Sequence, residues 1–517
     1  MRFRKEVCML SIINSSNIIG IESFLTKVEV DITNGIPSFN IVGLPSTEIK
    51  ESRERVKSAI INSGYTFPNA RIIVNLSPAD IKKEGSFLDL PISIGILRSC
   101  IKKSDEYFNE SMFIGELSLD GKVRRAKGIL PMVAGAKSQG IKRIFIPKDN
   151  LVESSFIDGI DILPISSLKE CIDYLNQRLN INKSLHYKQI NNKNNILYDE
   201  DFEDVRGNYF VKRGAEIAAA GNHNILMIGP PGSGKTMIAK RIRTILPDIN
   251  IDEVLEVSKI YSVAGLIDEK IGIINKRPFR SPHHTSTKQS LIGGGNNPKP
   301  GEIVLSHRGV LFLDEIAEFD KRILETLRQP IEDKYINISR VNYNVKYPCN
   351  VLLVSAMNPC PCGYYMSDKE CKCRGYEVNR YLNKISGPLL DRFDIFIEVN
   401  QIPFDEFNKN SKSEKSIDIK FRVEEARKIQ LKRFSNDIIK TNNEIKSSKI
   451  EEYCKLSKEA KDMTNLIFSK YKLSNRSYTK LLKMARTIAD LDGSDIINSN
   501  HINESFSYRK AYYTYFE

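Results

Sequence analysis

Eight residues of this sequence have the composition and spacing of a phosphate-binding loop. Gly229-Pro-Pro-Gly-Ser-Gly-Lys-Thr236 fits the pattern G-x-x-x-x-G-K-T and separates an apolar segment (NILMIG) from a helical one (MIAKRIRTIL). The glycines let backbone N–H groups close on phosphates, while Lys235 reaches the β- and γ-phosphates and the Thr236 hydroxyl ligates Mg²⁺. The sequence therefore predicts ATP and Mg²⁺ as cofactors, bound by Gly229, Pro230, Pro231, Gly232, Ser233, Gly234, Lys235 and Thr236.

Polar residues that suit ATP hydrolysis follow two later apolar segments. The segment GVLFL is followed by Asp314, which we expect to hold the Mg²⁺ through water, and by Glu315, which we expect to polarise the attacking water. The next segment, NVLLVSAM, is followed by Asn358, the predicted water-orienting group. The alternative for Asn358 is a cap on the strand or on the turn before Pro359.

Two arginines have the properties of groups that stabilise charge on a transferred phosphoryl group. Arg392 comes shortly before the strand-like segment IFIEV, and in a ring of subunits it would project into the neighbouring active site. Arg476 opens a predicted C-terminal helix and is expected to contact the γ-phosphate. The alternatives are a surface ion pair of Arg392 with its flanking aspartates, and a solvated basic face formed by Arg476, Lys480 and Lys483.

Four of the nine cysteines are bunched in a short stretch of the chain. Cys360, Cys362, Cys371 and Cys373 offer four thiolates, enough for a tetrahedral Zn²⁺ site, with free thiols or a redox pair as alternatives. The other cysteines are scattered, which favours a reducing, cytoplasmic compartment over a disulfide framework.

Composition excludes a membrane protein and favours a polyanionic partner. No stretch reaches the roughly 18 consecutive apolar residues that a membrane helix needs. The net charge is +13, and basic residues outnumber acidic ones between Lys420 and Glu517, as in proteins that bind nucleic acid. The basic, partly apolar start of the chain lacks a cleavage site, so secretion is not expected.

Hydrophobic patterns divide the chain into four segments. Residues 9–178 alternate strand-like runs (KVEVDI, FNIVGL, RIIVNL, RIFIP) with helical ones, residues 179–204 are a polar, Asn-rich linker, and residues 205–404 form a second α/β unit. Residues 405–517 are predicted to be helical, with Phe421, Ala426 and Ile429 opening one apolar stripe and Leu481, Leu482, Ala485 and Ile488 forming another.

These motifs and their order resemble those of the YifB/ComM family of magnesium-chelatase-like AAA+ proteins along the whole chain. The most specific matches are RPFRSPHHT from Arg277, AMNPCPCG from Ala356 and ISGPLLDR from Ile385. The resemblance implies a P-loop AAA+ α/β core with a helical insertion around Val257–Gly295, a hairpin around Tyr335–Pro348, and a C-terminal helical lid in which Arg476 is the second sensor. It also implies a homo-hexameric motor that drives branch migration of DNA during uptake and recombination.

Residues 9–178 resemble the Lon-protease-type (S5-type) α+β domain, with GELSLDG from Gly115 as the clearest anchor. Peptidase activity needs a Ser nucleophile and a Lys base. The lysine position is occupied by Leu130, the nucleophile position falls near Leu88, and no base accompanies the nearby Ser86. We therefore expect a scaffold domain without a peptidase site.

A DNA motor is the favoured function, with a chelatase-type remodeller of a protein partner as the alternative and an ATP-dependent protease as the least favoured. The predicted nucleic-acid contacts are basic residues near the RPFRSPHHT motif and in the C-terminal helices: Arg277, Arg280, His283, His284, Lys480 and Lys483. Family members open with a leader that Met9 onward matches, so we expect the functional chain to begin at Met9 rather than Met1.

Overall fold

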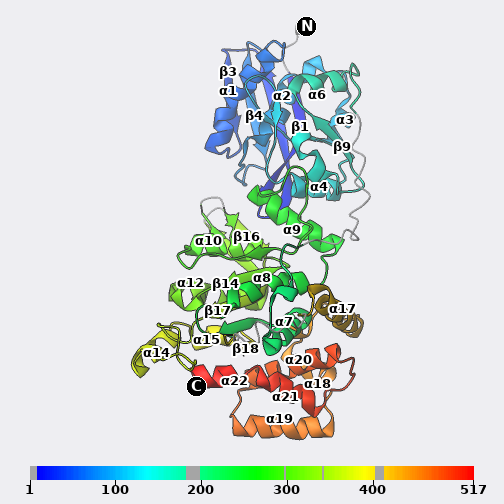
Figure 1. The fold of residues 1–517 in the computed structure, drawn as a ribbon. Coiled ribbons are helices and arrows are strands. Elements are labelled where there is room, and N and C mark those ends of the chain that lie inside the picture. The colour runs from blue at the N-terminus through cyan, green and yellow to red at the C-terminus, as the bar shows by residue number, and fades with distance from the viewer. Residues whose placement is uncertain (1–8, 182–197, 296–297, 341–342, 402–412) are drawn as a thin grey trace.

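The computed structural model describes residues 9–181, 198–295, 298–340, 343–401 and 413–517. Figure 1 shows three parts stacked along the long axis: an N-terminal sheet with its helices, a central sheet with its helices, and a C-terminal group of helices. The predicted leader before Met9 and most of the predicted linker lie outside the described residues. Among the helices that the structure describes, none is long and apolar enough to cross a membrane.

The N-terminal part is built on a seven-stranded mixed sheet in the order β3-β4-β2-β1-β5-β8-β9. The four strand-like runs of the sequence become β2, β3, β4 and β8, as predicted. Helix α1 begins at a serine cap, since the Ser46 hydroxyl accepts the backbone N–H of Ile49. The elements of this part are β1 (Met9–Ile19), β2 (Glu22–Thr33), β3 (Ser38–Val42), α1 (Thr47–Asn62), β4 (Arg71–Ser77), α2 (Asp89–Ile96), α3 (Asp105–Asn109), β5 (Ser111–Phe113), β6 (Glu116–Leu117), β7 (Val123–Arg124), α4 (Ile129–Ser138), β8 (Arg143–Pro147), α5 (Leu151–Ser154), β9 (Asp161–Ile165) and α6 (Leu168–Leu175).

Strand β1 lies in the middle of this sheet although its sequence is rich in serine and asparagine. It pairs antiparallel with β2 over its whole length and parallel with β5. The buried Ser15 hydroxyl donates to the Phe113 carbonyl at 2.9 Å, and the Asn14 amide donates to the Phe108 carbonyl at 3.2 Å. These bonds satisfy polar groups that would otherwise be costly to bury.

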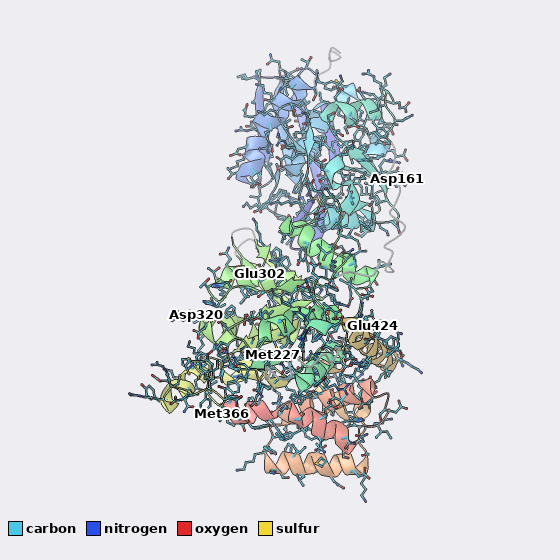
Figure 2. All side chains as sticks on the ribbon, viewed as in Figure 1. Asp161, Met227, Glu302, Asp320, Met366 and Glu424 are labelled. Atoms are coloured by element: carbon cyan, nitrogen blue, oxygen red, sulfur yellow. The ribbon has the colours of Figure 1, made fainter. Side chains whose placement is uncertain are left out.

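The central part is built on a five-stranded sheet in the order β11-β14-β17-β10-β18, and every neighbouring pair is parallel. Its strands are short and almost wholly apolar, as expected for a sheet covered on both faces. Met227 of β10 lies in the middle of this layer in Figure 2 and is fully buried. The elements are α7 (Tyr209–Gly221), β10 (Ile225–Ile228), α8 (Lys235–Ile245), α9 (Ile251–Ala264), β11 (Phe279–Arg280), α10 (Lys288–Ile292), β12 (Gly293–Gly294), β13 (Lys299–Pro300), α11 (Glu302–Leu305), β14 (Val310–Leu313), α12 (Lys321–Thr326), α13 (Arg328–Asp333), β15 (Tyr335–Arg340), β16 (Tyr343–Pro348), β17 (Leu352–Met357), α14 (Gly375–Leu382), α15 (Gly387–Leu390) and β18 (Ile395–Glu398).

Two features expected from the family resemblance can be compared directly with the structure. Strands β15 and β16 pair antiparallel with Tyr335 opposite Pro348, which confirms the predicted hairpin. The expected insertion around Val257–Gly295 is only partly helical, because it contains the end of α9, strand β11 and α10. Helix α9 reaches the N-terminal part, where the Ser262 carbonyl accepts the backbone N–H of Gly128.

The C-terminal part consists of helices, as predicted, but one of the two expected apolar stripes is only partly right: Ala426 is buried as expected and Phe421 is not. On α17 the buried stripe contains Ile419, Val423 and Ala426, while Phe421 is 64% exposed. Ile419, Val423 and Ala426 have the spacing i, i+4, i+7, which puts them on one face and turns Phe421 away from it. The helices are α17 (Ser416–Arg433), α18 (Ile450–Tyr453), α19 (Lys458–Lys470), α20 (Asn475–Leu491), α21 (Ser499–Ser507) and α22 (Lys510–Phe516).

A buried carboxylate joins the central sheet to helix α20. Asp394, directly before β18, accepts the backbone N–H of Asn224 at 3.1 Å and lies 3.3 Å from the Lys480 ammonium and 3.8 Å from the His223 ring. Burial alone would raise the pKa of Asp394, but Lys480, His223 and the Asn224 N–H together hold that pKa well below its usual range. The ion pair therefore stabilises the fold at neutral pH, and this contribution is lost as the pH falls through the lowered pKa.

We predict that Asp394→Asn lowers the free energy of unfolding of the central and C-terminal parts by about 3 to 5 kcal/mol, because it leaves Lys480 buried without its counter-ion. Urea unfolding at pH 7, compared with the exposed-carboxylate control Asp462→Asn on α19, measures the difference. Equal midpoints for the two variants would show that Asp394 has no such role.

Candidate nucleotide site

The loop between β10 and α8 forms a concave backbone in front of a helix N-terminus. Gly232 and Gly234 have φ values of 76° and 89°, a region that favours glycine. Lys235 is the first residue of α8, and its ammonium donates to the carbonyls of Gly229 at 2.7 Å and Pro230 at 2.8 Å. Free N–H groups at a helix N-terminus attract anions, so this loop has the geometry of a phosphate site.

The other residues predicted for ATP chemistry meet this loop at the carboxyl edge of the sheet. The Thr236 hydroxyl donates to the Asp314 carboxylate, which follows β14, at 2.7 Å. The Lys235 ammonium lies 3.3 Å from the amide oxygen of Asn358, which follows β17. Glu315 follows Asp314, and its side chain is 56% exposed. The sheet thus gathers hydroxyl, carboxylate, amide and ammonium groups, a set suited to Mg²⁺ and phosphate.

Burial affects the charge of the phosphate-loop lysine. It lowers the pKa of Lys235 to about 8, although the Asp314 and Glu315 carboxylates oppose the shift. Bound phosphates would favour the charged ammonium still further. Nucleotide binding is therefore expected to weaken as the pH rises above about 8, because Lys235 must then take up a proton on binding.

Arg392 and Arg476 lie at the opposite, amino edge of the same sheet. Arg392 pairs with Glu332 of α13, and the Arg476 guanidinium lies 3.5 Å from the same carboxylate. Strands β18 and β10 run parallel, with Ile225 opposite Ile395. Arg392 precedes β18 and the phosphate loop follows β10, so the two lie at opposite ends of the strands. The four residues of β10 span about 13 Å. The structure therefore does not bring either arginine to the phosphate loop of its own chain.

Two of the predicted nucleic-acid contacts near β11 are engaged within the chain. The Arg277 guanidinium donates to the Arg308 carbonyl at 2.7 Å and to the Glu253 carboxylate at 3.1 Å. Arg280 forms two bonds to Glu302, at 2.6 and 2.7 Å. Arg277 thus has most of its N–H donors engaged within the chain, and the charge of Arg280 is paired with a carboxylate. DNA contact by these residues stays a prediction.

The two lysines of α20 that were predicted to contact nucleic acid are also engaged within the chain. The Lys480 ammonium donates to the Phe393 carbonyl at 2.7 Å besides pairing with Asp394, and Lys483 donates to the Asn443 carbonyl at 2.9 Å. Burial lowers the pKa of Lys480 to about 8, although Asp394 opposes the shift. Instead of forming a solvated basic face, these lysines hold α20 against neighbouring segments.

His283 and His284 lie beside the predicted catalytic glutamate, a placement that was not predicted. The His284 ring nitrogen is 3.9 Å from the Glu315 carboxylate, and the His283 and His284 ring centres are 4.1 Å apart. Both histidines follow β11, which pairs with β14 and ends at the same edge of the sheet. The parallel pairing explains the placement, but β11 has only two residues and is too short to be recognised as a strand in the sequence.

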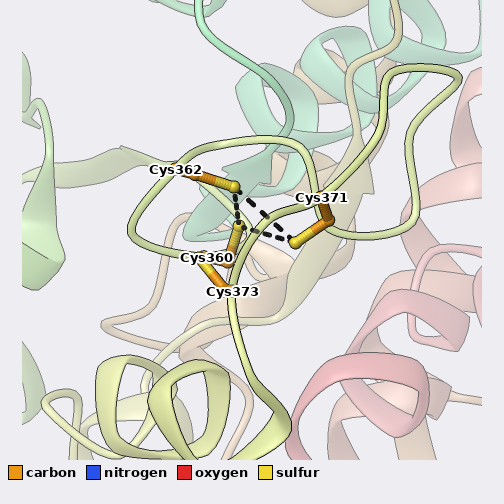
Figure 3. A group of neighbouring side chains, drawn as sticks. All are labelled: Cys360, Cys362, Cys371 and Cys373. Atoms are coloured by element: carbon orange, nitrogen blue, oxygen red, sulfur yellow. Dashed lines mark hydrogen bonds between the residues drawn. The ribbon is translucent and has the colours of Figure 1, made fainter.

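The four bunched cysteines converge, as Figure 3 shows. Their sulfur atoms all lie within 4.8 Å of one another, and those of Cys360, Cys362 and Cys371 are 3.4, 3.6 and 3.8 Å apart. A tetrahedral zinc ion with Zn–S bonds of about 2.3 Å would have its sulfur ligands about 3.8 Å apart. The cluster could therefore hold a metal, and its donor set fits a soft divalent cation such as Zn²⁺.

Comparison with known proteins gives matches over nearly the whole chain. Family models match residues 28–150 ("Subunit ChlI of Mg-chelatase"), 201–407 ("Magnesium chelatase, subunit ChlI") and 413–509 ("Magnesium chelatase, subunit ChlI C-terminal"). The protein YifB of Escherichia coli is 41% identical over 501 residues, and the competence protein ComM of Haemophilus influenzae is 38% identical over 508 residues, each covering 97% of both chains. The chain belongs to the YifB/ComM family of magnesium-chelatase-like proteins.

A more distant match extends beyond the YifB/ComM family. The maternal DNA replication licensing factor mcm6 of Xenopus tropicalis is 22% identical over 334 residues, which cover 59% of this chain and 36% of that protein. Membership of the magnesium-chelatase-like AAA+ proteins supports an ATPase and implies ATP and Mg²⁺ as its cofactors. The phosphate loop and the polar groups at the carboxyl edge of the sheet are where the structure would hold them.

We predict that Lys235→Ala weakens ATP binding by about 10- to 100-fold, since a hydrogen bond to a charged group contributes about 1.5 to 3 kcal/mol. Titration with a fluorescent ATP analogue at pH 7 measures the affinity. Lys240→Ala removes an exposed lysine from the same helix and should bind ATP like the parent protein. Equal affinities for the two variants would contradict the placement of the phosphates.

Proposed function

We propose that this protein is a ring-forming ATPase that couples ATP hydrolysis to movement along DNA, as a branch-migration motor in DNA uptake or recombination. In each site Lys235 and the backbone of the phosphate loop bind the nucleotide, and Thr236 and Asp314 hold Mg²⁺. Glu315 polarises the attacking water, which Asn358 orients. The ring is a cytoplasmic homo-hexamer.

The observation that carries this proposal is the separation of the catalytic groups between the two edges of one sheet. The carboxyl edge has the phosphate loop, Asp314, Glu315 and Asn358, whereas Arg392 and Arg476 lie together at the amino edge. A positive side chain beside the phosphoryl group stabilises the negative charge on its oxygens during transfer and so speeds hydrolysis. A site without such an arginine is therefore incomplete. A neighbouring chain that turns its amino edge toward this loop supplies both arginines.

DNA is the favoured substrate of the motor for three reasons. The chain has a net charge of +13, which suits a polyanionic partner. ComM is named a competence protein, and the more distant mcm6 is named a DNA replication licensing factor. The β15–β16 hairpin is a two-stranded sheet separate from the central sheet, and we propose that it faces the DNA in the ring.

A protein-remodelling function is the second candidate, because the matching family models are named for a magnesium chelatase subunit. In that function the ATPase acts on a protein partner instead of DNA. Both functions use the same nucleotide site, so they differ only in what stimulates turnover.

The remaining parts of the chain support the motor. We propose that residues 9–178 form a Lon-protease-like scaffold without peptidase activity: the Ser86 hydroxyl donates to Glu116, and Leu130 is buried at the predicted lysine position. The C-terminal helices act as a lid whose Arg476 responds to the nucleotide of the next chain. The cysteine cluster holds a structural Zn²⁺.

The rate of ATP hydrolysis with and without DNA tests the proposal. We predict a several-fold increase with single-stranded or forked DNA at low salt, and a loss of this increase at high salt as phosphate contacts are screened. Glu315→Gln serves as the control for contaminating ATPases, since it should bind ATP and stop turnover with or without DNA. A DNA-independent rate would contradict the DNA motor and favour the protein remodeller.

A further inference from the structure

The cysteine cluster lies between two parts of the proposed nucleotide site. Cys360 comes two residues after Asn358, and the turn that follows it reaches the phosphate loop at Gly363. A Cβ atom added to Gly363 would lie only 2.6 Å from Cδ of Pro231, so the backbone of this turn is in direct contact with the phosphate loop. Gly363 has a φ of 87°, which also favours glycine.

The turn is closed around the sulfur of Cys360. The backbone N–H of Gly363 donates to the Cys360 carbonyl at 3.0 Å, and the N–H of Tyr365 donates to the Cys360 sulfur at 3.3 Å. Cys360 is fully buried. The thiol of Cys360 therefore lies inside the turn, so that a metal bound to it would help to fix the shape of the turn.

The other end of the cysteine loop also returns to the nucleotide site. After Cys373 the chain enters α14, whose buried Tyr381 lies beside the backbone of Asn358. Between β17 and α14 the loop has no helix or strand of its own. Met366, at the margin of the central part in Figure 2, is 60% exposed, so the apolar core does not hold the loop at its tip. Tyr365 packs partly against the core, and bonds from the four thiols to a metal would add to what fixes the shape of the loop.

We propose that a divalent metal of the zinc class, bound by Cys360, Cys362, Cys371 and Cys373, positions the nucleotide site by holding the Gly363 turn against Pro231. The metal takes no part in hydrolysis. Its four bonds to sulfur hold the loop in one shape. The loop then positions the phosphate-binding backbone on one side and Asn358 on the other. Nucleotide affinity therefore depends on metal occupancy. This inference rests on the proposed ATPase site and adds a metal-dependent control to it.

Two variants separate metal binding from its effect on the nucleotide site. Elemental analysis of the parent should find one zinc per chain, and purified Cys371→Ser, which lacks one metal ligand, should have lost it. Its affinity for a fluorescent ADP analogue should fall on the order of 10- to 100-fold, because the loss of one hydrogen bond to a charged phosphate group has an effect of about this size. Lys372→Ser changes an exposed residue between two ligands and should keep both zinc and affinity.

Gly363→Ala leaves all four thiols in place but adds the Cβ that meets Pro231. It should retain zinc and still bind the analogue more weakly than the parent, which keeps the test valid even if Cys371→Ser fails to fold. Zinc-free parent protein, parent-like affinity in zinc-free Cys371→Ser, or parent-like affinity in Gly363→Ala would each overturn the inference. Failure of the parent protein to bind the analogue would instead contradict the proposed ATPase site.

Discussion

The parallel direction of the strands in the central sheet is the constraint on which the rest of the structure depends. All five strands are parallel, so whatever follows a strand gathers at one edge and whatever precedes it gathers at the other. Lys235, Asp314 and Asn358 follow strands, and Arg392 precedes one. The buried carboxylate of Asp394 stabilises the amino edge of the sheet, because it joins the start of β18 to the start of β10 and to Lys480.

Residues next to long, regular apolar segments could be predicted from the sequence. The phosphate loop, Asp314 and Asn358 each adjoin such a segment, and the structure brings them together as the motif order implies. The cysteine cluster was also recognisable, because its four thiols lie within a short stretch and need no distant partner. The hairpin at Tyr335–Pro348 was expected from the family resemblance, and the pairing of β15 with β16 confirms it.

Features that depend on long-range contacts could not be predicted. In strand β1 the buried side chains of Asn14 and Ser15 have hydrogen-bond partners 94 and 98 residues away, so the composition of β1 does not identify it as a central strand. Charged side chains gave no sign of whether they are free: Arg280 was expected at a DNA surface and is paired with Glu302. The position of His284 beside Glu315, and the contact of Gly363 with Pro231, arise only when separate segments fold onto one another.

The central claim is that each ATP site combines the phosphate loop of one chain with the arginines of the next. Mixing Lys235→Ala protein with Arg392→Ala protein and measuring ATP hydrolysis tests it most directly. Each variant should be inactive alone, and the mixture should regain part of the parental rate, because some interfaces then pair an intact Lys235 with an intact Arg392. A mixture as inactive as its two components, or full activity of Arg392→Ala alone, would contradict the account.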